Sequence, residues 1–513
     1  MDGKQLQRIV QWTGLVLAPL AAATLYLLLP DTYGDATGTE VPFTHAGQAT
    51  LAIMLWMALW WLTEAVDITV TALLPLAVFP ILEIADIKAT AAPYANPLIF
   101  LFMGGFLLAI AMQRWGLGLR IALTTLKIVG TQPTRMIGGF MLVTAVLSAF
   151  VSNTATSAMM LPIALSVIAL LKTHGNTESG DDSMGKNFAL CLLLGIAYAA
   201  SIGGVATIIG TPPNVFLAGF LDDKIDPQYQ TQISFARWMM LGVPLAMVFL
   251  PLTWLLLTKV LYPIRVKQIP GAAELIEQQV QQLGKPNRGE WATFIVFILA
   301  VTFWITRSLL TPLQVTIGET TLRPFASLTD EGIAMTAAML LFVIPSGSPE
   351  QRFVLNWENA KGLPWGILLL FGGGLSLASA VAANGVAEFL GAQATYIAGA
   401  PVIVMVLCVA AGILFLTELT SNTATAATLV PVLAALAPGL GVHPYILIFP
   451  ATLAASCAFM LPVATPPNAI IFGSGEVTIP QMAKAGLWLN IIGVLLITAL
   501  TMTLVGPLFA PGN

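Results

Sequence analysis

The chain has 513 residues, of which 57% are hydrophobic and only 9% are charged, and its mean hydropathy is +0.87. Soluble proteins carry about 25% charged residues, so the composition excludes a soluble protein and predicts an all-α integral membrane protein. The net charge of −4 is small and gives no sign of a nucleic-acid partner. The three cysteines lack CxxC spacing and the three histidines are isolated, so we predict neither a disulfide framework nor a transition-metal site.

Apolar runs of about 20 residues, the length that spans a bilayer as a helix, recur along the chain. The first run follows Lys4 and Arg8 and has no clear cleavage site after it, so we predict a retained anchor rather than a signal peptide. In chain order, the eleven predicted crossings are 10–30, 47–66, 67–82, 96–113, 188–220, 236–264, 291–310, 331–345, 364–382, 444–471 and 485–508.

Two further apolar stretches, 136–171 and 400–438, are too long for one crossing and too interrupted for two. Each is predicted to be a re-entrant hairpin of two half-helices, since non-helical backbone at membrane depth is tolerated only inside protein or beside water. The stretch 265–290 is the only long polar connector, and it separates the two halves of the chain. It is either an amphipathic surface helix or a plain linker.

The lysines and arginines indicate how this layout sits in the membrane. Cytoplasmic loops carry an excess of these residues. With a cytoplasmic N-terminus, sixteen of the 21 lysines and arginines fall on the inner side. The five on the outer side are Lys88, Lys224, Arg237, Arg307 and Arg323. An odd number of crossings then leaves the C-terminus outside a cell inner (plasma) membrane.

Each hairpin carries a polar motif, and the two motifs are copies of one another. Tip 1 is residues 148–156 (SAFVSNTAT), and tip 2, 269 positions later, is residues 417–425 (TELTSNTAT). After each tip a second motif interrupts an apolar run, GTPPN at 210–214 and ATPPN at 464–468. In the predicted layout the first hairpin enters from the cytoplasm and the second from outside. The halves are therefore predicted to be inverted repeats, as in many secondary transporters.

The two breaks after the tips favour a cation. Paired prolines remove two backbone donors and cannot continue a helix, so the carbonyls around Gly210 and Ala464 need another partner. Unwound carbonyls and helix ends coordinate sodium in transporters of this kind, and hydroxyl and amide oxygens of the tips can complete such sites. One predicted sodium site comprises Ser148, Ser152, Asn153 and Gly210, and the other comprises Thr417, Thr420, Asn422 and Ala464.

The helices that follow the tips favour an anion. Each directs free N–H groups and the positive end of its dipole towards the tip. The side-chain donors there are Asn153, Thr154, Asn422 and Thr423. No lysine or arginine occurs in 136–171, 188–223 or 362–482, so a dianion at mid-membrane lacks compensating side-chain charge. Cations from solution would supply it, and uptake would then be coupled to the sodium gradient. Glu418, inside tip 2, is either a functional carboxylate or a group that caps or positions the tip.

These motifs resemble those of the divalent anion/sodium symporter family. The resemblance rests on VSNTATSAMMLPI at 151–163, TSNTAT at 420–425 and ATPPNA at 464–469, and it runs from about residue 45 to the C-terminus. Members of the family carry succinate, malate, fumarate, citrate or sulfate. Related sodium-independent exchangers tend to place basic residues near the tips. This chain has Thr156 and Thr425 there, which looks like the sodium-coupled branch.

The resemblance implies a homodimer whose protomers each contain a scaffold domain and a transport domain that moves like an elevator. It implies the same sodium ligands as above. The substrate carboxylates would meet Asn153, Thr154, Thr211, Pro212, Ser421, Asn422, Thr423, Thr465 and Pro466. The implied division is 1–95 for the anchor and scaffold, 96–235 for the first transport unit, 236–362 for linker and scaffold, 363–484 for the second transport unit, and 485–513 for the last crossing.

We therefore predict a sodium-coupled symporter of small divalent anions, first of all C4-dicarboxylates, working by alternating access in the lipid bilayer. A sodium-independent dicarboxylate or citrate exchanger is the first alternative. An intramembrane enzyme is the second, although it would need a nucleophile–base pair or metal cluster at membrane depth, and the scattered histidines argue against one.

Overall fold

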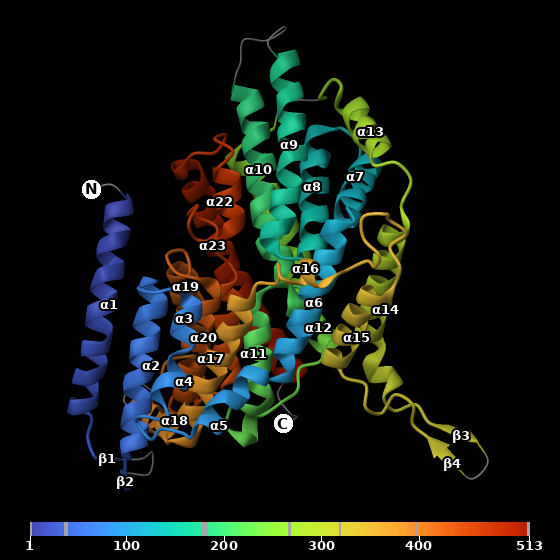
Figure 1. The fold of residues 1–513 in the computed structure, drawn as a ribbon. Coiled ribbons are helices and arrows are strands. Elements are labelled where there is room, and N and C mark those ends of the chain that lie inside the picture. Colours follow the sequence, from blue (N-terminus) through green and yellow to red (C-terminus); the bar gives the residue numbers. More distant parts are fainter. Residues whose placement is uncertain are drawn as a thin grey trace.

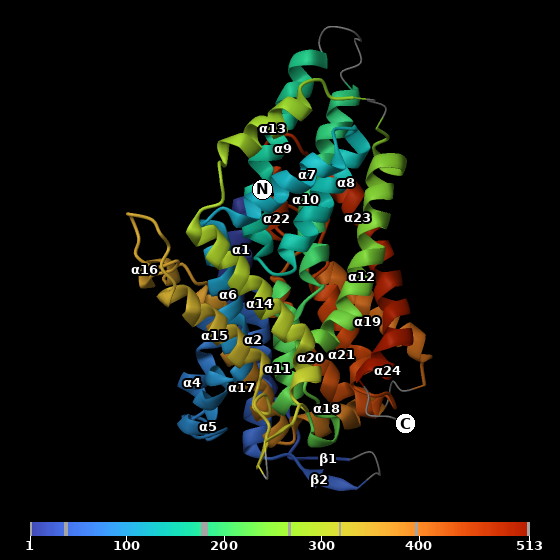
Figure 2. The ribbon, with the colours of Figure 1, turned by 90° about the vertical axis from the view of Figure 1, so that its right-hand side faces the viewer.

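The computed structural model describes residues 3–34, 39–175, 183–264, 268–317, 320–395 and 399–509, which are mostly helical (Figures 1 and 2). The elements before the linker are α1 (Gly3–Leu28), α2 (His45–Thr63), α3 (Ile68–Ala72), α4 (Leu74–Val78), α5 (Ile87–Ala91), η1 (Ala92–Ala95), α6 (Pro97–Arg114), α7 (Leu117–Val129), α8 (Pro133–Ser148), α9 (Asn153–Gly175), α10 (Ser183–Gly204), η2 (Ile208–Gly210), α11 (Pro212–Asp223), η3 (Pro227–Tyr229), α12 (Phe235–Leu255) and η4 (Leu256–Leu261).

The second half follows the same order. Its elements are α13 (Ala272–Gln282), α14 (Arg288–Leu310), α15 (Asp330–Val343), α16 (Trp357–Ala360), α17 (Trp365–Ala383), α18 (Val386–Ala394), α19 (Val402–Leu416), α20 (Asn422–Gly439), α21 (Tyr445–Ala455), α22 (Pro466–Phe472), α23 (Ile479–Leu500), η6 (Thr501–Val505) and α24 (Gly506–Phe509). Two short antiparallel hairpins, β1 (Thr32–Gly34) with β2 (Glu40–Pro42) and β3 (Val315–Ile317) with β4 (Thr320–Leu322), were not predicted.

Both predicted hairpins form, and they come from opposite ends of the molecule. The first is not built of two half-helices as predicted, because α9 has 23 residues and is long and apolar enough to cross a bilayer, whereas α8 has 16. In both views α8, α9 and α10 lie in the upper part with α22, whereas α19, α20 and α21 lie in the lower part with α11 (Figures 1 and 2). The broken helix α10–α11 therefore runs downward and α21–α22 runs upward. This arrangement confirms the inverted repeats.

Small residues let each half pack closely on the other. A Cβ added at Gly104 of α6 would lie 2.7 Å from the backbone of Ala334 in α15. The matching glycine of the second half, Gly373 of α17, meets the backbone of Ala72 at the end of α3 in the same way. Each glycine thus permits a close helix crossing between halves, which holds the two repeats in one core.

One predicted crossing differs from the structure, because the stretch 67–82 forms α3 and α4 instead of one helix. The predicted crossing 331–345 is the single helix α15, whose 14 residues span about 21 Å at 1.5 Å per residue. Among the described residues, nine helices are long and apolar enough to cross a bilayer. A new helix, α4, begins at Leu74 with Pro75 in its first turn, where hydropathy alone indicates a continuous apolar run. The exact number of crossings stays a prediction.

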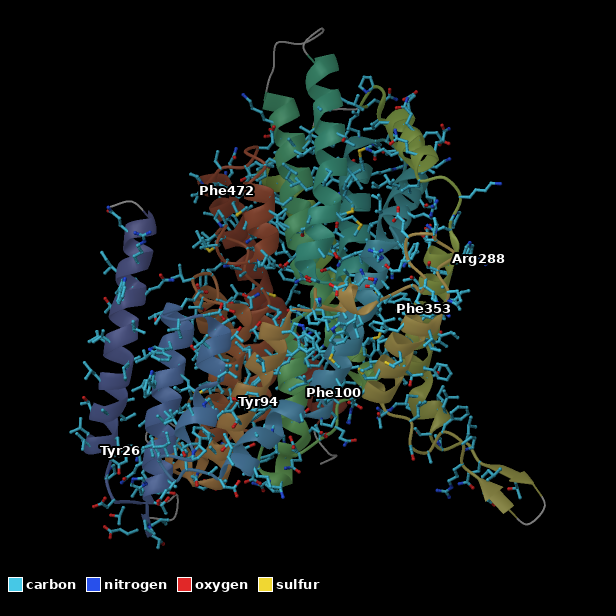
Figure 3. The ribbon with its side chains drawn as sticks, viewed as in Figure 1. Tyr26, Tyr94, Phe100, Arg288, Phe353 and Phe472 are labelled. Atoms are coloured by element: carbon cyan, nitrogen blue, oxygen red, sulfur yellow. The ribbon has the colours of Figure 1, made fainter. Side chains whose placement is uncertain are left out.

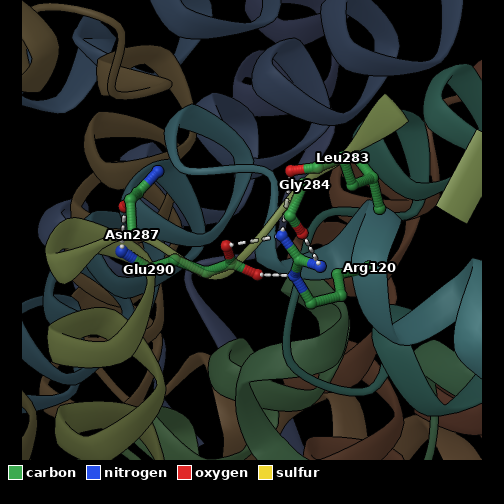
Figure 4. A network of polar contacts seen from close by, with 5 residues as sticks. All are labelled: Arg120, Leu283, Gly284, Asn287 and Glu290. Atoms are coloured by element: carbon green, nitrogen blue, oxygen red, sulfur yellow. Dashed lines mark hydrogen bonds and ion pairs between the residues drawn. The ribbon is translucent and has the colours of Figure 1, made fainter. Parts of the chain in front are cut away.

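The polar linker forms the amphipathic helix α13, which covers α7. Arg120 of α7 donates to both carboxylate oxygens of Glu290, with Oε2 at 3.1 Å (Figure 4). It also donates to the backbone carbonyls of Gly284 and Leu283, at 3.0 and 3.3 Å. Lys127 pairs with Glu277 of α13 at 2.6 Å, and its hydrogen bond lowers the pKa of that carboxyl. The linker is thereby fixed to the helix that leads into the first hairpin.

Candidate functional site

The site begins where the hairpins turn. α8 ends at Ser148 and α9 starts at Asn153, so the turn of tip 1 lies where the upper and lower parts of the molecule meet. The Ser148 side chain is fully buried. Its Oγ lies 2.8 Å from the carbonyl oxygen of Ala200 in α10 and also contacts Oδ1 of Asn153. Tip 1 is therefore bound to the broken helix of its own half.

Tip 2 repeats this geometry in the second half. Oγ1 of the buried Thr417 lies 3.1 Å from the carbonyl oxygen of Ala455 in α21 and 2.7 Å from Oδ1 of Asn422. A hydroxyl has only one proton to donate. In each half, three oxygens therefore converge with one proton among them. Such an oxygen-rich, proton-poor group suits a hard cation, which takes oxygen ligands.

The unwound segment between α10 and α11 can lie against tip 1 because Gly204 has no side chain. A Cβ at Gly204 would lie 2.8 Å from Oδ1 of Asn153 and 3.1 Å from the carbonyl oxygen of Gly210. The structure thus brings Ser148, Asn153 and Gly210 together at the end of α10. Sodium binding by these residues stays a prediction.

The remaining predicted sodium ligands lie at the same breaks. Ser152 is half-buried in the turn of tip 1, and Ala464 is buried two residues before α22. Oγ1 of Thr420 shares a hydrogen bond of 2.7 Å with Oγ1 of Thr425 and donates to the carbonyl of Leu416 at 3.0 Å. That hydroxyl is thus engaged within the hairpin, and sodium binding by Thr420 stays a prediction.

The predicted substrate-binding residues lie at the starts of four helices. α9 packs against α22, and α11 packs against α20, so each contact joins the two halves. All four helices run away from the boundary between the upper and lower parts of the molecule (Figures 1 and 2). Their N-termini therefore lie together at this boundary. Thr154 is exposed and Thr423 is nearly buried. The others are Thr211, Pro212, Ser421, Thr465 and Pro466.

The sequence analysis missed two asparagines that shape the breaks. Nδ2 of Asn214 donates to the carbonyls of Thr207 and Gly204, at 2.8 and 3.4 Å. Asn468 repeats the bonds at the same spacing in the chain, to Leu461 at 3.0 Å and Ala458 at 3.2 Å. Each side chain holds an unwound segment in shape. The signal was present, because Asn closes both TPPN motifs.

Glu418 positions the second break. Its buried carboxylate accepts the backbone N–H groups of Phe459, Met460 and Leu461 at 2.7 to 3.2 Å, and Nδ2 of Asn490 at 2.9 Å. The residue in the same place of tip 1 is Ala149, whose carbonyl accepts the hydroxyl of Thr207. Of the two roles left open by the sequence, this geometry favours positioning. It also makes the two half-sites chemically different.

Comparison with known proteins gives matches along nearly the whole chain. A family model described as the sodium:sulfate symporter transmembrane region matches residues 11–510. The sodium-dependent dicarboxylate transporter SdcS of Staphylococcus saprophyticus is 43% identical over 505 residues, which are 97% of this chain and 92% of that protein. The protein of the same name from Staphylococcus aureus strain MW2 is 43% identical over 490 residues, covering 95% and 90%.

Two solved structures share the fold at low identity. The YdaH transporter of Alcanivorax borkumensis aligns with a TM-score of 0.58 and 13% identity, covering 98% of both chains. MtrF of Neisseria gonorrhoeae, described as illuminating a class of antimetabolite efflux pumps, aligns with a TM-score of 0.56 and 11% identity, covering 99% and 96%. At this identity the similarity concerns the fold alone.

Proposed function

The chain belongs to the sodium:sulfate symporter family, and from this premise we propose that it couples sodium entry to the uptake of small divalent anions, C4-dicarboxylates first. It is a transporter, so the intramembrane enzyme is set aside. The proposal draws on the relatives named as sodium-dependent dicarboxylate transporters.

One observation supports the assignment of sodium binding to particular residues. In each half a buried hydroxyl, an asparagine oxygen and a backbone carbonyl converge with a single proton among them. A sodium ion would supply the positive charge that these oxygens lack. The ligands proposed for one ion are Ser148, Ser152, Asn153 and Gly210, and for the other Thr417, Thr420, Asn422 and Ala464.

The substrate would bind between the two tips. Two carboxylates need two sets of donors, and the N-termini of α9 and α20, from opposite repeats, offer free N–H groups and positive dipole ends. Thr154, Thr423 and Ser421 would add hydroxyl donors. Because the sodium ligands are part of the same tips, each bound ion also fixes the donors that hold the dianion.

Transport requires this site to open to each side in turn. We propose that the hairpins and broken helices, within 96–235 and 363–484, move as a transport domain against a scaffold of the other helices, and that two protomers associate through their scaffolds. The upper end, with α7 and α13, would face the cytoplasm, and the lower end, with α5 and α18, would face outside (Figure 1).

The test is uptake into proteoliposomes of labelled succinate, malate, fumarate, citrate and sulfate. Uptake of dicarboxylates driven by an inward sodium gradient, and abolished when choline replaces sodium, is the expected result. Uptake that persists in choline and needs internal dicarboxylate would establish the exchanger instead. Preference for sulfate over every dicarboxylate would overturn the substrate assignment while leaving sodium coupling intact.

A further inference from the structure

A cavity of about 370 Å³ lies apart from the two tips. It is enclosed by the C-terminal parts of α11, α17 and α20 together with α18, all at the lower end of the molecule (Figures 1 and 2). None of the proposed sodium or dicarboxylate ligands lines it. Its volume falls within the range of small-molecule sites, about 300–1,000 Å³.

The inner wall of the cavity is made of small apolar residues. The buried ones are Ala378 and Val381 from α17, Ala392 from α18, and Ala434 and Ala435 from α20. These side chains offer no hydrogen bonds, so the part of a ligand that reaches them must be apolar. The wall is held closed at one point, because a Cβ at Gly439 of α20 would overlap the backbone of Gly391 in α18.

The rim has the opposite character and is acidic. Nζ of Lys224 is bound at 2.8 Å to the carboxylate of Asp223, so the charge of this lysine is already balanced. Asp226 and Glu388 also line the rim. Asp226 accepts the backbone N–H of Gln228 at 3.1 Å, and Glu388 is exposed in the first turn of α18. The rim is thus net negative.

Two tyrosines add aromatic rings to the lining of the cavity. The buried Tyr33 and the half-buried Tyr229 both line it, and Tyr33 packs edge-on against Phe389 of α18 with ring centroids 5.2 Å apart. The faces of aromatic rings attract cations, best when the cation is weakly hydrated. Exposed carboxylates and aromatic rings in the lining of an otherwise apolar cavity therefore favour a quaternary ammonium group joined to an apolar body.

We propose that this cavity binds an organic cation with an apolar body, and that its occupant slows transport. The helix α18 begins after Gly385, which has a positive φ of 73°, so a tight turn separates it from α17. A ligand between Tyr33, in the proposed scaffold range 1–95, and α11, α18 and α20, in the proposed transport ranges, would clamp the two domains together. The expected effect on the rate of transport rests on the proposed function, through alternating access. Binding of the organic cation to the cavity does not.

The test uses hexyltrimethylammonium as the probe and the full-length protein in nanodiscs, with binding measured by titration calorimetry. Hexanesulfonate, which has the same apolar chain and the opposite charge, is the matched control. We expect saturable binding of the cation and at least tenfold weaker binding of the anion. Equal binding of both, or of neither, would overturn the proposal.

Two variants locate the site. Ala382→Phe places a ring in the cavity from an exposed position on α17 and should abolish binding. Glu388→Gln should weaken it about threefold to fivefold, the effect of one exposed charge pair. Glu358→Gln, an exposed carboxylate paired with Lys361 away from the cavity, should leave it unchanged. Wild-type binding in Ala382→Phe would contradict the assignment to this cavity.

Sodium-driven uptake separates this proposal from the proposed function. In wild-type proteoliposomes, external probe should lower the maximal rate of dicarboxylate uptake and leave its half-saturating concentration unchanged, and Ala382→Phe should remove the inhibition. Competition with the dicarboxylate would overturn the separate site. Absence of any sodium-driven uptake, with cation binding intact, would refute the proposed function alone.

Discussion

At the scale of single residues, the two tip asparagines decide how the protein would recognise sodium. Each amide oxygen lies against a buried hydroxyl that is also in contact with a helix carbonyl. Without a cation, this arrangement keeps lone pairs facing one another, which is costly at a buried position. An ion placed among them removes that cost, so the amide oxygens should contribute to sodium affinity directly.

Replacement of either tip asparagine should therefore weaken sodium binding. In Asn153→Ala and Asn422→Ala we expect the sodium concentration for half-maximal uptake to rise about tenfold, the effect of about 1.4 kcal/mol of lost binding. Asn187→Ala, whose amide reaches only the carbonyl of Pro263 at 3.4 Å, is the control. Unchanged sodium dependence in both tip variants would count against the assigned ligands.

The threonines that follow these asparagines should act on the substrate instead. Thr154→Ala and Thr423→Ala each remove a hydroxyl donor at a helix start, so we expect the half-saturating dicarboxylate concentration to rise more than that of sodium. Thr154→Ser and Thr423→Ser keep the hydroxyl and should restore affinity. If the alanine variants leave the substrate dependence of uptake unchanged, these hydroxyls do not meet the dianion.

Glu418 offers a third test at this scale, because its carboxylate serves four donors at once. Glu418→Gln keeps the shape but turns an NH₂ group towards backbone N–H groups, and an unsatisfied buried donor costs about 1–3 kcal/mol. We expect both a lower melting temperature and a higher sodium concentration for half-maximal uptake. Glu358→Gln, on an exposed surface, should change neither.

At the scale of elements, close contact between the first hairpin and its broken helix depends on a glycine. A Cβ at Gly203 of α10 would overlap the backbone of Ala145 in α8, and backbone cannot move aside as a flexible side chain can. Gly412 of α19 has nothing within 4 Å of the same position. The two glycines are therefore a matched pair.

Gly203→Ala should destabilise the protein by about 1–3 kcal/mol, as overpacking does. Gly412→Ala should leave stability unchanged or raise it, since alanine favours a helix by about 0.5–1 kcal/mol over glycine. Thermal unfolding of the purified variants measures both effects. Similar melting temperatures for the two variants would show that α8 and α10 do not pack as described.

Much of the element order was predictable because the sequence repeats itself. The hairpins, the broken helices and the close-packing glycines each occur twice at a fixed spacing, and a feature seen twice is hard to mistake for chance. The two helices α3 and α4 were not predictable from hydropathy, since the run 67–82 is mostly apolar and Asp67, Pro75 and Pro80 are its main interruptions.

The polar contacts behind the site were less predictable than the tips. Asn214, Asn468 and Glu418 act on backbone groups 7 to 43 positions away in the chain, and no local pattern shows which carbonyl or N–H an isolated polar side chain will reach. The tips could be found because a cluster of hydroxyl and amide groups is unusual in an apolar run.

At the scale of the whole molecule, the distribution of lysines and arginines predicts which end of the protein faces the cytoplasm. Of the elements that carry predicted inner lysines and arginines, α7, with Arg120 and Lys127, lies in the upper part (Figure 1), and the start of α14, where Arg288 lies, is above the middle of the molecule (Figure 3). Those that carry the outer ones, such as Lys88 on α5 and Lys224 after α11, are at the lower end. Positive-inside insertion then requires the upper end to face the cytoplasm.

Cysteine labelling measures this orientation. In a Cys408→Ser background, which removes the exposed native thiol, Gln228→Cys lies at the lower end and Gln282→Cys at the upper end, both at exposed positions. A membrane-impermeant maleimide should label the first in intact cells and the second only after permeabilisation. The opposite result would invert the protein in the membrane. It would also place the acidic rim of the cavity beside α18 on the cytoplasmic side, where external hexyltrimethylammonium could not reach it.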